Sequence, residues 1–410
     1  MTDDRTMTDR LYTRQFFQVF AAVALFMTGN ALQFHFGQYV AYLGYGMDTL
    51  GLVLSIAMIG TLLLRLQIGS WIDRYGCRPT WVIAGLLVAL NAFLLQWVQA
   101  LWLVVLLRAL MAMATATVMT TVAVFAAQIA PPKRRAESIG TMGLAGFMGM
   151  ILGPTLGDWI FSSAVESIWT YRLFFGTSAV CSLASCVVML RLKLPPKLQK
   201  ESTGRTPSVD AVEAGPSQFK IIVKHWPGII LLVGALFAMV FCVQSLFLER
   251  LAEERGFKDI KLFFLVYCPT AMAIRILLRR MPERIGRSRI LLVGLLLQAC
   301  GLLSLAGVVT QWHLVLPSLL MGAGHSLIFP SMVDLAAEKF PIQHRGAGTS
   351  LILGAGDLGM LIGFAALGGM IETLGFDASL RALALAVVLV AAIFALVQRR
   401  WIFTRIARSG

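Results

Sequence analysis

Apolar residues occur in long stretches along most of this chain, and short polar segments separate them. A helix that crosses the hydrocarbon core of a bilayer needs about 20 apolar residues. Twelve stretches reach that length, so the pattern predicts an all-α integral membrane protein with twelve transmembrane helices. Their centres lie near residues 28, 60, 88, 115, 150, 181, 237, 268, 299, 324, 357 and 389.

The polar segments predict how these helices are grouped. Residues 1–14 form a polar tail, and residues 15–192 hold the first six stretches. Residues 193–224 are rich in Lys, Pro and Ser and cannot bury a core, so we expect a cytoplasmic linker there. Residues 225–398 hold the other six stretches, and residues 399–410 form a basic tail. The remaining loops are too short for a soluble catalytic domain, which argues against an enzyme.

The two halves repeat one pattern around a lone arginine. Arg65 and Arg275 each lie inside an apolar stretch, about 210 residues apart. Some two helical turns later each is followed by a carboxylate, then Arg, one spacer and Gly. Parallel repeats of this kind build one large class of secondary transporters, so we expect two pseudo-symmetric six-helix bundles.

Composition and charge support a membrane protein. The chain is 58% hydrophobic and 14% charged, and 35 Lys and Arg outnumber 21 Asp and Glu. Most of the basic residues fall in alternate loops, as the positive-inside rule requires, which predicts that both termini are cytoplasmic. The net charge of +14 therefore indicates contact with anionic lipid and no role with nucleic acid. We expect no cleavable signal peptide, and the short loops favour a bacterial inner membrane.

The loop after the second stretch contains Gly69, Asp73, Arg74, Gly76 and Arg78. Gly76 tolerates the positive φ of a tight turn, and Gly69 permits close approach of another helix. The segment resembles the signature loop of the major facilitator superfamily, from which only the residue after Gly76 departs. In that family the loop latches the two halves, so the resemblance implies a gating role. An ordinary positive-inside hairpin is the alternative.

The copy in the second half is degenerate. It retains Glu283, Arg284, Gly286 and Arg287, whereas Arg279 replaces the first glycine. The resemblance implies the same gating role for these residues.

The fifth stretch carries Gly140, Gly149, Gly153, Pro154 and Gly157. The last three glycines recur every four positions and share one helix face, while the proline bends the helix. This spacing resembles the antiporter motif of the same family, which is associated with export by exchange. A small-residue packing stripe is the alternative.

Three arginines lie inside predicted helices. Arg65 and Arg275 suit a pair of cations that bind a carboxylate or phosphate, or that snorkel to the headgroups. Arg108 resembles the family's fourth-helix arginine, which is implicated in proton coupling or in pairing with the loop aspartate. It lies in the outer half of its helix, so we do not expect it to pair with Asp73.

Titratable residues inside the predicted helices are candidates for proton transfer. Asp357, His325 and His35 could each carry a proton, or each could form an ordinary packing hydrogen bond. Polar residues on the first and seventh stretches are expected to contact substrate: Asn30, Gln33 and Gln244. The first stretch lacks an acidic residue, which disfavours a cationic drug.

These patterns lead us to expect a secondary active transporter that works by alternating access. Proton-coupled efflux is favoured, with the proton gradient as energy source, no cofactor and a functional monomer. The segments around His325 and Asp357 resemble bacterial exporters assigned to sugars, siderophores or metallophores, so an anionic, metallophore-like or sugar-like metabolite or a drug is the expected substrate. The alternatives are a symporter or uniporter for uptake, and a non-transporting membrane sensor or assembly partner.

Overall fold

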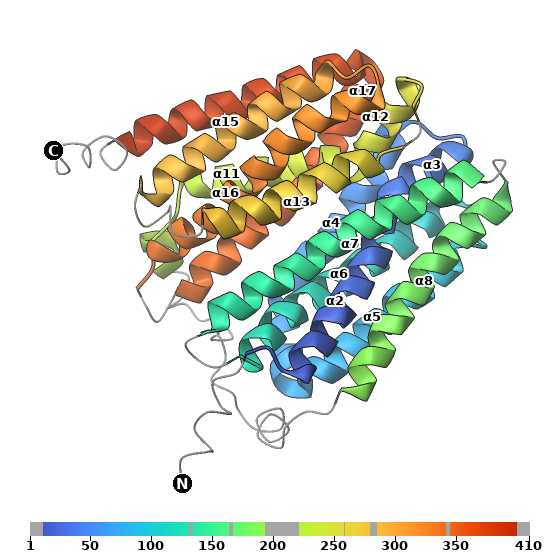
Figure 1. The fold of residues 1–410 in the computed structure, drawn as a ribbon, viewed down its shortest axis with the longest axis horizontal. Helices are drawn as coiled ribbons and strands as arrows, with labels where there is room; N and C mark the ends of the chain where they lie inside the picture. The colour runs from blue at the N-terminus through green and yellow to red at the C-terminus, as the bar shows by residue number, and fades with distance from the viewer. Residues whose placement is uncertain are drawn as a thin grey trace, which may run out of the picture. The chain divides into compact units, whose positions relative to one another are not determined.

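The computed structural model describes residues 11–130, 134–163, 167–192, 221–257, 259–278, 285–341 and 345–399. Every regular element in these ranges is helical (Figure 1). Contacts divide the chain into two units. Unit 1 comprises residues 1–39 and 56–208, and unit 2 comprises residues 40–55 and 209–410.

Unit 1 contains the helices of the first half of the chain. Residues 40–55 belong to unit 2, so α4 begins there and continues into unit 1. The elements up to residue 192 are α2 (Arg14–Leu32), η1 (Gln33–His35), α3 (Phe36–Tyr42), α4 (Met47–Tyr75), α5 (Cys77–Leu95), α6 (Leu101–Gln128), α7 (Arg135–Ser163) and α8 (Ile168–Arg191).

Unit 2 contains the helices of the second half. They are α11 (Ile229–Cys242), the π-helix η3 (Val243–Phe247), α12 (Leu248–Glu254), α13 (Lys261–Leu277), α15 (Arg287–Ala306), η4 (Gln311–Leu314), α16 (Val315–Glu338) and α17 (Arg345–Val397). The continuous α17 holds two helices, because Gly375 interrupts it with φ 76° and ψ 171°.

The helices account for all twelve apolar stretches. Ten helices in the described ranges are long and apolar enough to cross a membrane. One of them is the double helix α17, and the 17-residue α13 covers the stretch near residue 268. The structure is therefore an all-α membrane protein, as the sequence predicts.

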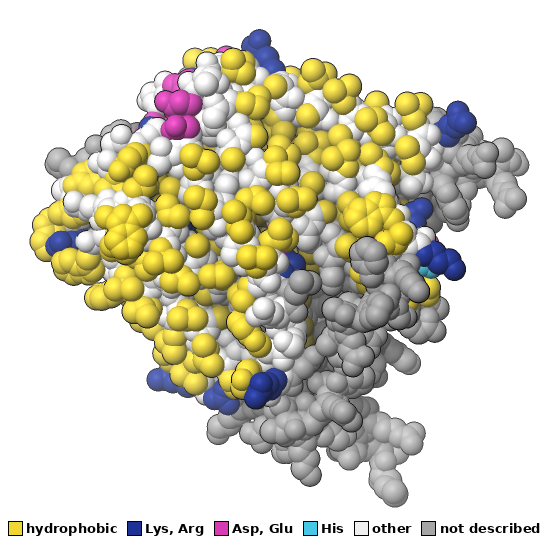
Figure 2. Space-filling view, turned by 180° about the vertical axis from the view of Figure 1, so that it is seen from behind, with side chains coloured by type: hydrophobic (Ala, Val, Ile, Leu, Met, Phe, Trp, Pro, Cys, Tyr) yellow, Lys and Arg dark blue, Asp and Glu magenta, His cyan; other side chains and the backbone are white. Residues whose placement is uncertain are grey.

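The surface is largely apolar, and several polar side chains are buried inside the helix bundles. Leu63 and Val180 are 69% and 64% exposed, whereas His35 and Gln244 are each 1% exposed. Figure 2 shows apolar side chains over most of one face, with Lys and Arg mainly near its edges. A soluble protein would not present such a surface, but the hydrocarbon core of a bilayer covers it at no cost.

A belt of tryptophans marks one end of unit 1. Trp97, Trp102 and Trp169 lie at the helix ends between α5 and α6 and at the start of α8, and each is at least 59% exposed. The guanidinium of Arg172 lies over two of these rings, 4.1 Å from the centroid of Trp97 and 4.6 Å from that of Trp169. Exposed tryptophans are enriched at the membrane–water interface, so this end lies at one headgroup layer.

The repeated loops turn in the same way in the two units. Gly76 caps the start of α5 with φ 81° and ψ 161°, and Gly286 caps the start of α15 with φ 99° and ψ 138°. This region of φ and ψ is open almost only to glycine.

The variant Gly76→Ala is therefore expected to be destabilised by about 1–3 kcal/mol. Gly69→Ala is the matched control, since no described atom lies within 4 Å of a Cβ added there. Thermal unfolding of the two purified variants checks this. An equal loss of stability in both would show that the turn at Gly76 does not depend on glycine.

Candidate functional site

The glycine face of α7 packs directly against α2 in unit 1 (Figure 1). A Cβ on Gly149 would meet Met27 and Thr28, and one on Gly153 would lie 2.6 Å from the backbone nitrogen of Leu32. A Cβ on Gly157 would overlap the imidazole of His35. Three glycines one turn apart thus allow the two backbones to approach so closely that no side chain fits between them.

A buried contact between a histidine and a carboxylate lies at the end of this helix packing. Nε2 of His35 is 2.9 Å from Oδ1 of Asp158, the residue that follows Gly157. The side chains are 1% and 0% exposed. Nδ1 of His35 is also buried and has no hydrogen-bond partner among the described residues. The ring of Phe161 stacks on the imidazole with centroids 5.6 Å apart, so the pair is closed off by apolar contacts.

A second polar contact starts from the same short element. Gln33 and His35 are the first and last residues of η1. Nη1 of Arg108 on α6 donates to Oε1 of Gln33 at 3.1 Å, and its Cζ lies 4.2 Å from the centroid of the Phe36 ring. Within the described part of the chain, no carboxylate forms an ion pair with Arg108, and its Nε is buried without a partner. The guanidinium is thus a half-buried cation that contacts an amide and an aromatic face.

Unit 2 carries its own buried polar cluster. The hydroxyl of Tyr267 on α13 is 2.5 Å from Nδ1 of His325 on α16, and Nε2 of Gln244 donates to the same hydroxyl at 3.1 Å. Gln244 lies in the π-helix η3, and such bulges often occur at functional sites. The rings of Phe237 and Phe329 lie 4.9 Å and 6.2 Å from the imidazole, so the cluster is enclosed by aromatic side chains.

Comparison with known proteins identifies the family. The model of the Major Facilitator Superfamily matches residues 16–310 and again residues 260–405, which together cover nearly the whole chain. The chain belongs to the Major Facilitator Superfamily.

The chain is similar to drug-resistance proteins. The chain is 24% identical over 317 residues to "Multidrug resistance protein MdtG" of Enterobacter lignolyticus, over 76% of this chain and 73% of the relative. It is 25% identical over 301 residues to "Tetracycline resistance protein, class E" of Escherichia coli, over 71% of both chains.

Solved structures of transporters share the fold. The nucleoside transporter NupG has a TM-score of 0.75 at 14% identity and covers 94% of this chain and 99% of its own. A D-xylose–proton symporter has a TM-score of 0.74 at 16% identity and covers 92% of this chain and 96% of its own. The protein is an integral membrane transporter of small molecules and not an enzyme.

The other residues that the sequence suggests for substrate or proton binding lie on the helices predicted for them. Arg65 on α4 and Arg275 on α13 are both half-buried, Asn30 is half-buried in the last turn of α2, and Asp357 on α17 is 8% exposed.

The signature loop makes its contacts through residues next to the glycine turn. Arg78 donates a hydrogen bond to the carbonyl of Leu190 at the end of α8. The guanidinium of Arg74 lies 5.3 Å from the centroid of the Tyr75 ring. The close helix approach expected at Gly69 is not found among the described residues, because open space surrounds that glycine.

Cys77 is the residue that departs from the superfamily pattern, and Arg287 is the equivalent residue in the second repeat. In the second repeat, Nη1 of Arg287 is 2.9 Å from Oε2 of Glu338 at the end of α16. In the first repeat, the thiol of Cys77 lies 3.3 Å from Oε1 of Gln128 at the end of α6. The first repeat thus has a neutral contact where the second has an ion pair. Glu283 and Arg284 lie outside the described residues.

Sequence reasoning missed Asp158 and Tyr267. Asp158 lies inside a predicted helix directly after the antiporter-like motif, and an ionisable residue at such depth is a signal of function. The sequence interpretation assigned the glycines before it to the antiporter-like motif and did not include Asp158. Tyr267 carries no such signal, since tyrosine is common in membrane helices.

Proposed function

We propose that this transporter exports a small molecule in exchange for protons, and that His35 and Asp158 together carry the proton. The observation that carries the proposal is the buried 2.9 Å contact between these two side chains. It lies where the glycine face of α7 meets α2, and these glycines match the motif associated with exchange.

The pair can hold a proton in a way that depends on access to water. With one proton shared between imidazole and carboxylate, the pair is a neutral unit or an internally compensated ion pair. Without that proton it is a buried negative charge, which an apolar site disfavours. A sealed site therefore retains the proton, and a site opened to water can release it.

The substrate contact of the proposal is Arg108. Its side chain is half-buried, its Nε is buried without a hydrogen-bond partner, and no carboxylate in the described ranges forms an ion pair with it. A substrate with a carboxylate or phosphate group would therefore meet an uncompensated cation. Gln33 accepts a hydrogen bond from Arg108, and His35 at the other end of η1 is paired with Asp158. Movement of this three-residue element would then link the affinity for substrate to the affinity for the proton, as exchange requires.

Substrate-driven proton flux tests this function. The purified protein would be reconstituted in liposomes with an internal pH dye and screened against multi-carboxylate chelators, sugars and amphiphilic drugs. Proton movement opposite to the substrate is expected for at least one anionic compound. Proton movement in the same direction as the substrate would indicate symport, and substrate uptake without proton movement would indicate a uniporter; either result contradicts exchange.

A further inference from the structure

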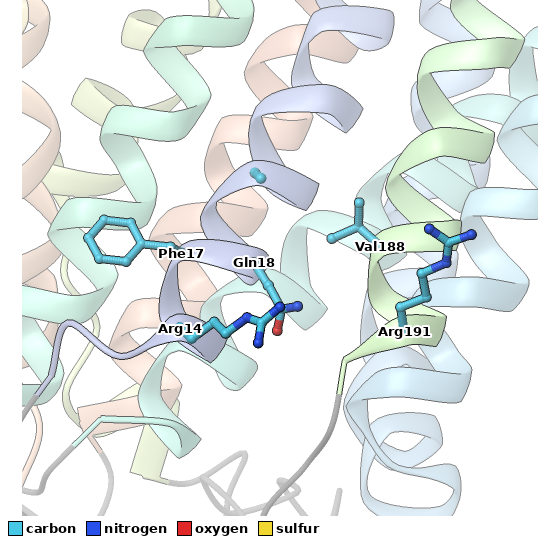
Figure 3. Close-up of a pocket in the computed structure, with 6 residues that line it drawn as sticks. Arg14, Phe17, Gln18, Val188 and Arg191 are labelled. Carbon is cyan, nitrogen blue, oxygen red and sulfur yellow. The ribbon is translucent and has the colours of Figure 1, made fainter.

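A groove of about 370 Å³ lies between the ends of α2 and α8 in unit 1 (Figure 3). It is lined by two arginines, one glutamine and three apolar side chains: Arg14, Phe17, Gln18, Ala21, Val188 and Arg191. The four residues on α2 recur every three or four positions and so form one stripe of that helix. Figure 3 shows Arg14 and Gln18 extending from α2 toward α8, with Arg191 on the opposite helix.

Next to the groove, two serines of α8 form hydrogen bonds with the backbone of α2. Oγ of Ser178 donates to the carbonyl of Gly29 at 2.9 Å, and Oγ of Ser185 donates to that of Ala22 at 2.8 Å. From Ala22 toward the start of α2, the helix carries the longer side chains of Gln18 and Arg14. The hydrogen bond of Ser185 therefore joins the two helices about one turn from Val188, at the side of the groove away from the helix ends.

The groove lies at the level of lipid headgroups. It is at the opposite end of unit 1 from the tryptophan belt, since α2 begins and α8 ends there. The apolar stretches of both helices stop at Arg14 and Arg191. Under the positive-inside rule this end faces the cytoplasm.

The charge of the groove is positive. Arg14 and Arg191 are exposed, and no carboxylate in the described part of the chain pairs with either. The neighbouring Arg78 adds a third cation, because it is bonded to the carbonyl of Leu190. Guanidinium groups bind phosphate oxygens in pairs of hydrogen bonds, and basic pockets between membrane helices bind anionic headgroups.

We propose that this groove binds one anionic glycerophospholipid. The phosphate lies between Arg14 and Arg191, and the amide of Gln18 donates to a headgroup oxygen. The first carbons of an acyl chain pack against Phe17, Ala21 and Val188. Phosphatidylethanolamine binds less well, because its own ammonium compensates the phosphate.

Retention of lipid by the full-length protein tests the site. Native mass spectrometry would follow titration with phosphatidylglycerol and, separately, with phosphatidylethanolamine. The wild type is expected to retain phosphatidylglycerol preferentially. The double variant R14Q/R191Q is expected to lose about 30-fold in its affinity for that lipid, because two cations near the headgroup are removed.

Two further variants keep the test decisive. Arg74→Gln removes an exposed cation of the signature loop that does not line the groove. This variant should retain lipid as the wild type does. R14K/R191K keeps both positive charges and should recover most of the binding. Recovery would show that R14Q/R191Q loses lipid because of its charge and not because replacement of these two arginines prevents folding. Equal retention of the two lipids, unchanged retention in R14Q/R191Q, or displacement by inorganic phosphate would overturn the proposal of a lipid site.

Discussion

Replacing Asp158 with Asn is expected to abolish substrate-driven proton movement, with at least a tenfold loss of flux as the order of magnitude. Asparagine keeps the size of the side chain and can still accept a hydrogen bond from His35, so folding should be retained. It cannot take up or release a proton, so the buried pair would lose the carboxylate that alternates between a protonated and a deprotonated form. The measurement is proton flux in liposomes with an internal pH dye.

Matched variants separate this result from general damage. Asp48→Asn changes an exposed aspartate at the start of α4, whose carboxylate bonds only locally to Thr49, and it should leave the flux unchanged. His35→Gln should reproduce the loss seen in Asp158→Asn. If Asp357→Asn stops the flux while Asp158→Asn does not, the proton is carried in unit 2 and the assignment to the first bundle is wrong.

Replacing Gly153 with Ala is expected to destabilise the protein by about 1–3 kcal/mol and to impair transport. The added Cβ would lie 2.6 Å from the nitrogen of Leu32 and 2.7 Å from the carbonyl oxygen of Thr28, both backbone atoms that cannot rotate away. The helices α2 and α7 must then separate, which also pulls Asp158 from His35. Thermal unfolding in detergent and flux in liposomes measure the two effects.

The same helix supplies controls for this prediction. No described atom lies within 4 Å of a Cβ added to Gly140 or Gly146. Alanine at either position should be neutral or should stabilise the helix by up to about 1 kcal/mol, because alanine has the higher helix propensity. A loss of stability at Gly140 as large as that at Gly153 would mean that the whole helix, and not its contact with α2, is sensitive to substitution.

Much of the fold could be predicted from local pattern alone. The apolar stretches are long because the bilayer requires about 20 apolar residues in each crossing, and no tertiary contact is needed to recognise them. The stretch near residue 268 becomes the 17-residue helix α13, and those near residues 357 and 389 merge into α17 across the positive φ of Gly375. These differences concern boundaries, which depend on local backbone conformation more than on hydropathy.

The candidate site could be predicted only in part. A spacing of four places Gly149, Gly153 and Gly157 on one face, since a helix has 3.6 residues per turn. That spacing does not say which helix the face meets. Nor does it distinguish these glycines from Gly140, which belongs to the same motif but has open space around it in the described structure.

By itself, then, the sequence determined the membrane class, the repeated halves, the superfamily and the helices that carry the polar residues, because these follow from composition and from spacing along one helix. Only the tertiary structure decided the partners. His35 and Asp158 are 123 residues apart, and Arg108 and Gln33 are 75 residues apart. Which buried charge meets which depends on how whole helices pack, and packing is set by the shapes of many side chains together.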